Sequence, residues 1–133
     1  WACTHCNTAS LYCVLYASLS YHGTYGDFFG ELLNNNMCRA NGYTLKTKQE
    51  ILKHFEIESE FKTFNSFSVI ENPAEFLDPE KFYQLRIANG GHFVAGYQEK
   101  GILYTTDTMN RGNPVKAVDV ITSGEFRWIA EVA

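Results

Sequence analysis

The chain has 133 residues, 15 of them acidic and 11 basic, which gives a formal net charge of −4 at pH 7. This length suits a single domain over residues 1–133 that buries a proper core. The acidic balance leaves no basic stripe for phosphates, so we expect no nucleic-acid partner. No apolar run approaches the roughly 18 residues that a membrane span needs, so we expect no span.

The beginning of the chain carries no recognisable targeting signal. No basic segment followed by an apolar stretch is present, as a secretory signal peptide would require. Trp1 rather than Met opens the chain, which fits either a fragment or a processed product. We expect a soluble protein, cytoplasmic or released from the cell. Its compartment, source organism and oligomeric state are left open.

The first half of the chain reads as helical. The apolar residues of the segment from Cys6 to Gly23 recur at three- and four-residue spacing, with Asn7 or Thr8 as the expected cap. A second helix is expected over Gly26–Asn34. The run Thr47-Lys48-Gln49-Glu50 fits a capping box, in which a hydroxyl and a carboxylate each satisfy a backbone donor. A third helix should therefore follow it.

From about residue 60 the pattern changes to strands. Phe67–Ile70 reads as a strand or loop, and Pro73 and Pro79 frame a connection with a short helical piece. Strands are expected over 82–88, 92–98, 102–106, 118–121 and 126–132, with turns at 89–91 and 98–101. Helices followed by an antiparallel sheet predict an α+β domain, with the N-terminal helices packed on the C-terminal sheet.

A histidine and an acid occupy matching places on two of the expected strands. His92 opens one strand, and Asp107 follows the next. If the strands form a hairpin centred on Glu99-Lys100, residues pair when their numbers sum to about 199, which sets His92 opposite Asp107 on the same face. A carboxylate there would orient the imidazole and stabilise its protonated form.

The cysteines supply the missing nucleophile. Cys6 is expected at the first turn of a helix, where unpaired N–H groups and the helix dipole favour thiolate over thiol. With His92 as acid–base and Asp107 as orienting group, the chemistry is acyl transfer, most simply hydrolysis of a peptide or isopeptide bond. No cofactor is needed, and the partner is a peptide or protein substrate.

These residues carry a resemblance to a known family. The run Cys-x-x-Ala-Ser-Leu-x-x-Val-Leu from Cys6, then His-Phe-Val-x-Gly-Tyr from His92, then Asp107, resembles the papain-like cysteine peptidases. It is most similar to the bacteriocin-processing (double-glycine leader) peptidases and their small bacterial and phage relatives. The resemblance implies a cysteine that begins a central helix packed on an antiparallel sheet, with Cys6 as nucleophile, His92 as general base and Asp107 as orienting acid.

The chain departs from that family pattern in two ways. Relatives usually have a glutamine several residues before the cysteine, whose amide helps to form the oxyanion hole, and none precedes Cys6. The expected first helix also looks about one turn too long. A shifted alignment would make Cys13 the nucleophile, with the Asn7 amide six residues upstream. We prefer Cys6, because Cys13 is expected on or near the buried apolar stripe, where a thiol is inert.

Several alternatives remain open from the sequence. Asn110 could replace Asp107 as the orienting group, and a bulge at Gly101 would shift the register and turn Asp107 to the other face. The same fold could serve as an inactive binding or structural module. Finally, the four cysteines, at positions 3, 6, 13 and 38, could form disulfides, or bind zinc through Cys3-x-x-Cys6 with nearby histidines, although a second close ligand pair is missing.

Overall fold

The computed structural model describes residues 5–58, 60–88, 91–106 and 113–132. Within them, one antiparallel sheet has the strand order β1-β6-β2-β3-β4-β5. The strands are β1 (Phe61–Phe64), β2 (Phe82–Ile87), β3 (His92–Glu99), β4 (Ile102–Thr106), β5 (Val115–Lys116) and β6 (Trp128–Val132). The expected α+β class is therefore confirmed.

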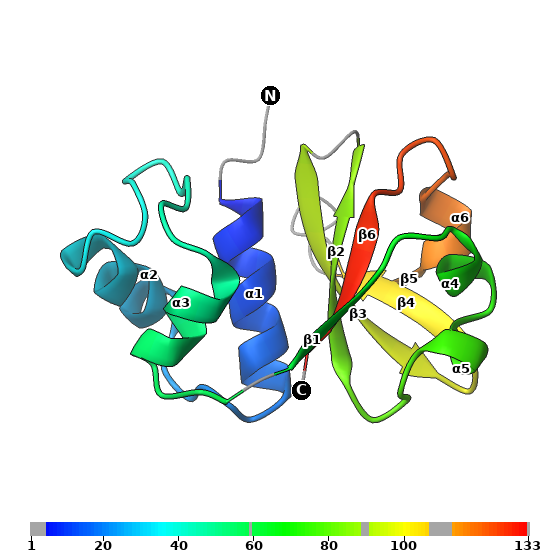
Figure 1. The fold of residues 1–133 in the computed structure, drawn as a ribbon, viewed down its shortest axis with the longest axis horizontal. Coiled ribbons are helices and arrows are strands. Elements are labelled where there is room, and N and C mark those ends of the chain that lie inside the picture. The colour runs from blue at the N-terminus through cyan, green and yellow to red at the C-terminus, as the bar shows by residue number, and fades with distance from the viewer. Residues whose placement is uncertain (1–4, 59, 89–90, 107–112, 133) are drawn as a thin grey trace.

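Helices cover both faces of this sheet (Figure 1). On one side lie α1 (Cys6–Ala17), α2 (Tyr25–Asn34) and α3 (Lys48–His54), and on the other lie the short helices α4 (Ser68–Glu71), α5 (Pro73–Phe76) and α6 (Ala117–Val120). As expected, α1 packs directly on β2 and β3, while α2 packs against α1. None of the helices in the described part of the chain has the length and apolar character of a membrane span.

The first helix is shorter than expected. It ends at Ala17 rather than near Gly23, because Leu19 adopts φ 61° and the N–H of Ser20 bonds back to the carbonyl of Leu15 at 2.9 Å. This is a Schellman ending, which usually uses glycine. Neither Asn7 nor Thr8 caps the helix, since the cap position is His5 and no side chain closes it.

The other two long helices begin as capping chemistry dictates. Thr47 accepts from the Glu50 N–H, and the Glu50 carboxylate accepts from the Thr47 N–H, so the expected capping box at α3 is confirmed. Thr24 and Asp27 form a second capping box at the start of α2, which the sequence reading missed. Each box satisfies two backbone donors that would otherwise be unpaired.

The β3–β4 hairpin is displaced from its expected register. Residues pair when their numbers sum to 201 rather than 199, so Glu99 pairs with Ile102 and Tyr97 with Tyr104. The loop is the two residues Lys100 and Gly101, both at positive φ (51° and 77°), as a type I′ turn requires. The shift is by an even number, so the residues that share a face stay the same within the paired part.

Two short segments differ from the expected secondary structure. Phe67–Ile70, read as a strand or loop, is mostly the helical turn α4, and Val118–Ile121, read as a strand, is mostly α6. In the second segment burial does not alternate as it would along a strand. Ala117 and Ile121, four residues apart, are buried, while Val118 and Val120 are exposed. Apolar β-branched residues suggest a strand, but burial in this part follows a helical spacing.

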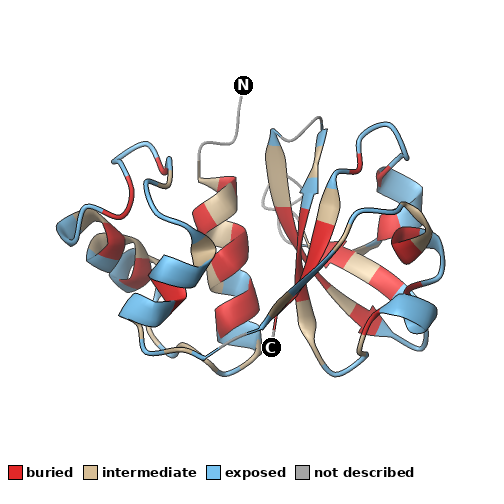
Figure 2. Ribbon diagram, in the orientation of Figure 1, coloured by how far each residue is buried: buried red, intermediate tan, exposed pale blue. Residues whose placement is uncertain are grey.

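Each face of the sheet has its own core (Figure 2). Tyr83, Leu85 and Val94 pack with residues from α4 and α6 on one face. On the other face Val14 of α1 packs against Ala95 and Val132, and this face is called the α1 face below. Because side chains alternate along a strand, the odd-numbered residues of β3 belong to the α1 face and the even-numbered ones to the opposite core.

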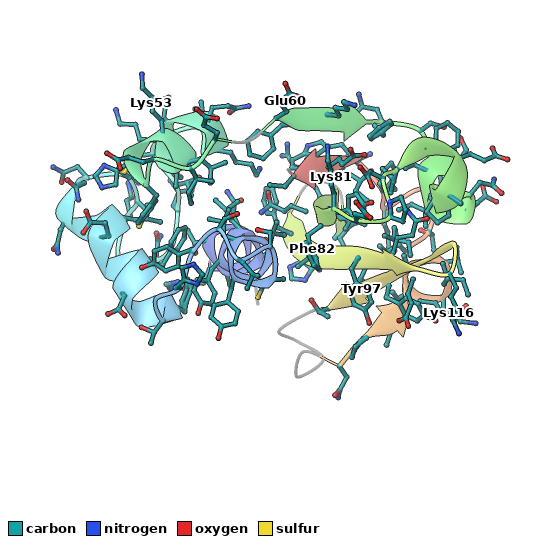
Figure 3. All side chains as sticks on the ribbon, turned by 90° about the horizontal axis from the view of Figure 1, so that it is seen from below. Lys53, Glu60, Lys81, Phe82, Tyr97 and Lys116 are labelled. Atoms are coloured by element: carbon teal, nitrogen blue, oxygen red, sulfur yellow. The ribbon has the colours of Figure 1, made fainter. Side chains whose placement is uncertain are left out.

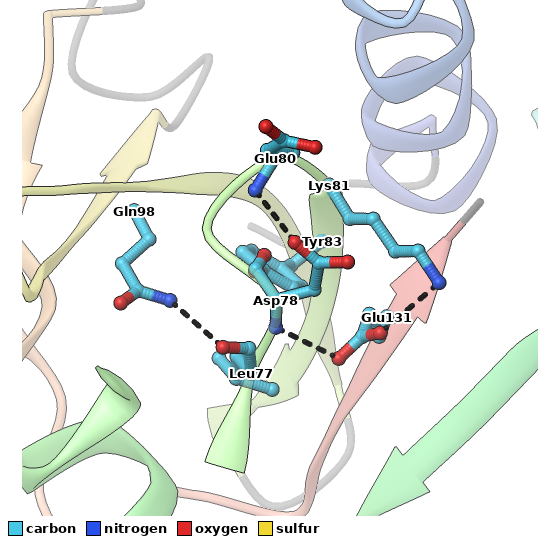
Figure 4. Close-up of polar contacts among 7 residues, drawn as sticks. All are labelled: Leu77, Asp78, Glu80, Lys81, Tyr83, Gln98 and Glu131. Carbon is cyan, nitrogen blue, oxygen red and sulfur yellow. Dashed lines mark hydrogen bonds and ion pairs between the residues drawn. The ribbon is translucent and has the colours of Figure 1, made fainter. Parts of the chain in front are cut away.

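A buried polar network fixes the chain just before β2 (Figure 4). Glu131, only 3% exposed, pairs with Lys81 at 3.3 Å and accepts from the Asp78 N–H at 3.3 Å. The Tyr83 hydroxyl donates to the Asp78 carbonyl, and burial raises the pKa of that phenol, which keeps its proton in place. A buried carboxylate needs such partners, so the network holds the connection from α5 to β2 against the sheet.

Replacement of Gly96 by Ala should destabilise the domain by about 2–3 kcal/mol. A Cβ at this position would lie 2.9 Å from the Tyr104 carbonyl oxygen and 3.0 Å from Leu85 Cδ1, so the backbone of β4 would have to move and the Leu85 side chain would have to shift. Gly30→Ala in α2 is the matched control, because a Cβ there meets no atom within 4 Å and should add about 0.5–1 kcal/mol of stability. Urea unfolding would measure both, and equal effects would contradict the packing described for Gly96.

Candidate functional site

Cys6 is the first residue of α1, as the sequence predicts. The start of this helix is tied to α2, because Thr8 Oγ1 lies 2.8 Å from the Tyr25 hydroxyl and His5 Nδ1 lies 3.2 Å from it. The side chain of Cys6 is 5% exposed. Burial alone would disfavour a thiolate, so activation of this sulfur depends on the helix start and on neighbouring charged groups.

The expectation that Cys13 is buried is wrong. It lies on the outer side of α1 and is exposed, whereas Cys6 is buried. Partial desolvation nevertheless raises the pKa of the Cys13 thiol, which makes it a poor thiolate. The Asn7 amide that a Cys13 site would use donates instead to Thr44 Oγ1 at 3.2 Å. Asn7 lies six residues before Cys13, which is about 9 Å along the helix axis. Cys13 is therefore a poor candidate nucleophile because its thiol stays protonated and the Asn7 amide is engaged elsewhere, and not because it is buried.

Three rows of residues cross the α1 face and place Cys6 relative to the sheet. Direct pairing aligns Val132, Phe82 and Tyr97 in the first row, Ala130, Gln84 and Ala95 in the second, and Trp128, Arg86 and Phe93 in the third. Val14 packs on the first two rows, and Ser10 bonds Gln84 in the second. Cys6 is one helical turn before Ser10 on the same helix side, which sets it level with the third row.

His92 begins β3 at this same end of the domain. Strand β3 and helix α1 run in the same direction, so the two elements that start with Cys6 and His92 start side by side (Figure 1). His92 pairs with Ile87 and is in phase with Val94, not with Phe93 and Ala95 of the α1 face. The imidazole must therefore turn around the end of the strand, next to Gly91, to meet Cys6.

The third expected residue lies outside the described part of the chain. Asp107 and its alternative Asn110 both fall in residues 107–112, directly after β4. The pairing of Ala95 with Thr106 is the last described contact of the β3–β4 hairpin. The described pairs of this hairpin sum to 201 rather than 199, so the register no longer predicts Asp107 directly opposite His92.

Gln84 links the sheet to the start of α1. Its side chain is fully buried, and its Nε2 donates to Ser10 Oγ at 2.8 Å and faces the carbonyl and side-chain oxygens of Asn7, each at 3.1 Å. Ser10 Oγ in turn donates to the Cys6 carbonyl at 2.6 Å. The donor and acceptor roles fit together only in this orientation of the amide. This chain of bonds positions the backbone of Cys6.

One atom of this network is left over. Gln84 Oε1 is buried and has no hydrogen-bond partner among the residues that the structure describes. Gln84 was not recognised from the sequence, where the family resemblance directs attention to a glutamine before the cysteine. The available signal was a single amide within the apolar run Phe-Tyr-Gln-Leu, since a buried polar side chain in a strand must find partners.

A second unrecognised group is Lys48, at the start of α3. Its Nζ lies 4.5 Å from the ring centre of Trp128 and 5.1 Å from that of Phe93, above the third row. Burial, together with the positive charge of Arg86 between those two rings, lowers the pKa of Lys48 to about 8. The end of the α1 face near Cys6 therefore holds a partly desolvated positive charge.

This pKa predicts how stability changes with pH. The folded state releases the Lys48 proton at about pH 8 and the unfolded state near pH 10.5, so the unfolded chain binds more protons between these values. The unfavourable burial of the charge is therefore present at pH 7 and relieved as pH rises. Relative to Lys48→Met, the wild type should gain about 1–2 kcal/mol from pH 7 to pH 10, allowing for partial exposure. Urea unfolding of both proteins at pH 7 and pH 10 would test this, and an equal change in unfolding free energy in the two proteins would refute it.

The cysteine alternatives receive no support from the described residues. Cys6, Cys13 and Cys38 are free thiols there, and Cys3 lies outside the described range. No group of three or more His, Cys, Asp or Glu within residues 5–58, 60–88, 91–106 and 113–132 is arranged to hold a metal ion. The two remaining histidines are exposed, and His54 Nε2 lies 2.8 Å from Glu31 Oε1.

Comparisons with known proteins leave the chain without an assigned family. No family model matches it, no curated protein matches it, and no solved structure matches it. The arrangement of its own residues is therefore the basis for any function assigned to it: a cysteine and a histidine that begin neighbouring elements, an amide network behind the cysteine, and a cationic aromatic row beside it.

Proposed function

We propose that this protein is a papain-like cysteine hydrolase that cleaves a peptide or isopeptide bond, with Cys6 as nucleophile and His92 as general acid–base. The observation that supports it most is the start of α1 and β3 at one end of the domain, with the Cys6 helix packed along the α1 face of the sheet. The same arrangement of a helix-start cysteine and a strand-start histidine is what the family resemblance implies. Asp107 is proposed as the orienting acid on the family resemblance alone.

The proposed reaction is acyl transfer in two steps. Cys6 Sγ, as thiolate, attacks the carbonyl carbon of the substrate, and the C–N bond breaks as the His92 imidazolium gives its proton to the leaving amine. Water then attacks the thioester carbon while His92 takes its proton, so the acid product leaves and the thiolate returns. The first turn of α1 favours negative charge at the sulfur and on the developing oxyanion.

An inactive binding module of the same fold is the competing proposal. It is favoured by two observations, the 5% exposure of Cys6 and the phase of His92 with the opposite core. In that case the thiol would be a packing residue and the histidine an ordinary strand end. The two proposals differ in the reactivity of a single sulfur, so they can be separated without knowing a substrate.

Site-resolved labelling separates them. Brief treatment with iodoacetamide at pH 6, followed by peptide mass spectrometry, should label Cys6 faster than Cys13, although Cys13 is the exposed thiol. An activated thiolate would outweigh exposure, because the Cys13 thiol has a raised pKa and is protonated at this pH. Cys38, which is buried, provides a second internal reference. Faster labelling of Cys13 with an inert Cys6 would favour the binding module.

A further inference from the structure

Beside the Cys6 end of α1 lies a polar pocket that the proposed hydrolysis does not use. It has a volume of about 200 Å³ and is lined mainly by Asn7, Thr8, Thr44, Lys46, Thr47 and Lys48. Asn7 directly follows Cys6 in the chain. Lys48 also contacts Phe93, which directly follows His92. The pocket thus lies between the first turns of α1 and α3, at the end of the domain where α1 and β3 begin, and its volume suits one side chain of a bound peptide.

The pocket carries positive charge in a protein that is negative as a whole. Between Leu32 and Gln49 the sequence contains Arg39, Lys46 and Lys48 but no Asp or Glu, while the net charge of the chain is −4. Such a local reversal of sign concentrates anions at that surface. The pocket is thus suited to a negatively charged group rather than to a cation.

The two lysines of the pocket have no acidic partner in the part of the chain that is described. Neither lysine takes part in the ion pairs His54–Glu31 and Lys81–Glu131 of the described residues. Glu50, the nearest acid along the chain, accepts hydrogen bonds from the N–H and the hydroxyl of Thr47 in the capping box. A partly buried ammonium without a counter-charge is costly, and an anion from outside would offset that cost.

We propose that this pocket binds the carboxylate of an acidic side chain in a peptide, close to the bond that Cys6 attacks. The cleavage part of this statement rests on the proposed function, whereas the binding part does not. A peptide is favoured over a small free acid because Tyr43 and Leu45, which flank Thr44 of the pocket in sequence, are exposed at 62% and 44%. These exposed side chains offer contacts to a peptide that extends beyond the pocket.

Binding can be measured in a variant that cannot cleave. In the Cys6→Ala protein, a fluorescein-labelled Gly-Glu repeat peptide should bind at least about tenfold more tightly than a Gly-Gln repeat of the same length, by fluorescence anisotropy at low salt. Replacing both Lys46 and Lys48 by Met should remove most of this preference. Lys46 is exposed, so the single variant Lys46→Met should fold and lose about fivefold.

Lys116→Met is the matched control, since this exposed lysine lies in the edge strand β5, two strands beyond β3, and Figure 3 shows it well away from α1. Its preference for the Gly-Glu peptide should equal that of the parent. Equal binding of the two peptides, or an equal loss in Lys116→Met, would overturn the assignment of the pocket. Because Cys6 labelling is measured separately, intact binding with an inert Cys6 would reject the hydrolase proposal and keep the pocket.

Discussion

Replacing His92 by Ala should slow the alkylation of Cys6 about tenfold at pH 6 and leave the rate nearly unchanged above pH 9. A neighbouring imidazolium raises the thiolate fraction at pH 6 by up to about two orders of magnitude over an ordinary thiol. Part of this gain is offset, because a thiolate of lower pKa is a weaker nucleophile. Above pH 9 an unassisted thiol ionises by itself, so the histidine no longer matters.

The other histidines serve as controls for that result. His22 and His54 are exposed, and His54 is engaged with Glu31, so neither alanine variant should alter Cys6. Hydrolysis of any peptide that the wild type cleaves should fall by about 10²–10⁴ in His92→Ala, since the general base is lost. An unchanged rate at pH 6, or an equal loss in His54→Ala, would remove His92 from the site.

Changing Gln84 to Glu should cost about 3–5 kcal/mol of stability at pH 7, a large effect for an isosteric replacement. The amide nitrogen now faces oxygens of Ser10 and Asn7 at 2.8–3.1 Å. A carboxylate there would face those acceptors at a position that is fully buried. Gln49→Glu, on the exposed side of α3, makes the same chemical change and should cost less than about 0.5 kcal/mol.

The loss in Gln84→Glu should shrink as the solution is acidified. Burial without a partner raises the pKa of such a carboxyl above its unfolded value, so the folded state binds more protons and gains stability as pH falls through that range. The protonated acid can also donate one hydrogen bond to Ser10 or Asn7. Urea unfolding at pH 4.5 and pH 7 would test this, and a cost equal to that of Gln49→Glu would mean that Gln84 is not a buried link.

The elements were largely predictable where a local chemical signal exists. The Thr47–Glu50 capping box located α3, and the alternation over residues 102–106 located β4 with its observed ends. The hairpin register was not predictable, because Lys100 enters the left-handed region that asparagine or glycine would normally signal. The end of α1 was missed for the same reason, since Leu19 occupies a position typical of glycine.

The site was predictable only in part. Cys6 and His92 could be selected because a helix start and a strand start have sequence signatures, and the structure has them as the first residues of α1 and β3. Gln84 and Lys48 act through residues far away in the chain, namely Ser10 and Trp128. Those contacts depend on how α1 and α3 pack on the sheet, which no local pattern specifies.

The most direct test of the proposed Cys6–His92 pair is the pH dependence of Cys6 alkylation in the wild type. An imidazolium beside the thiolate keeps the thiol ionised at lower pH, so we expect the rate to rise in a lower transition, well below the pH at which an ordinary thiol ionises. In His92→Ala the lower transition should disappear. A single rise with an apparent pKa of about 8.5 or above in both proteins would show an ordinary thiol, and the hydrolase proposal would be wrong.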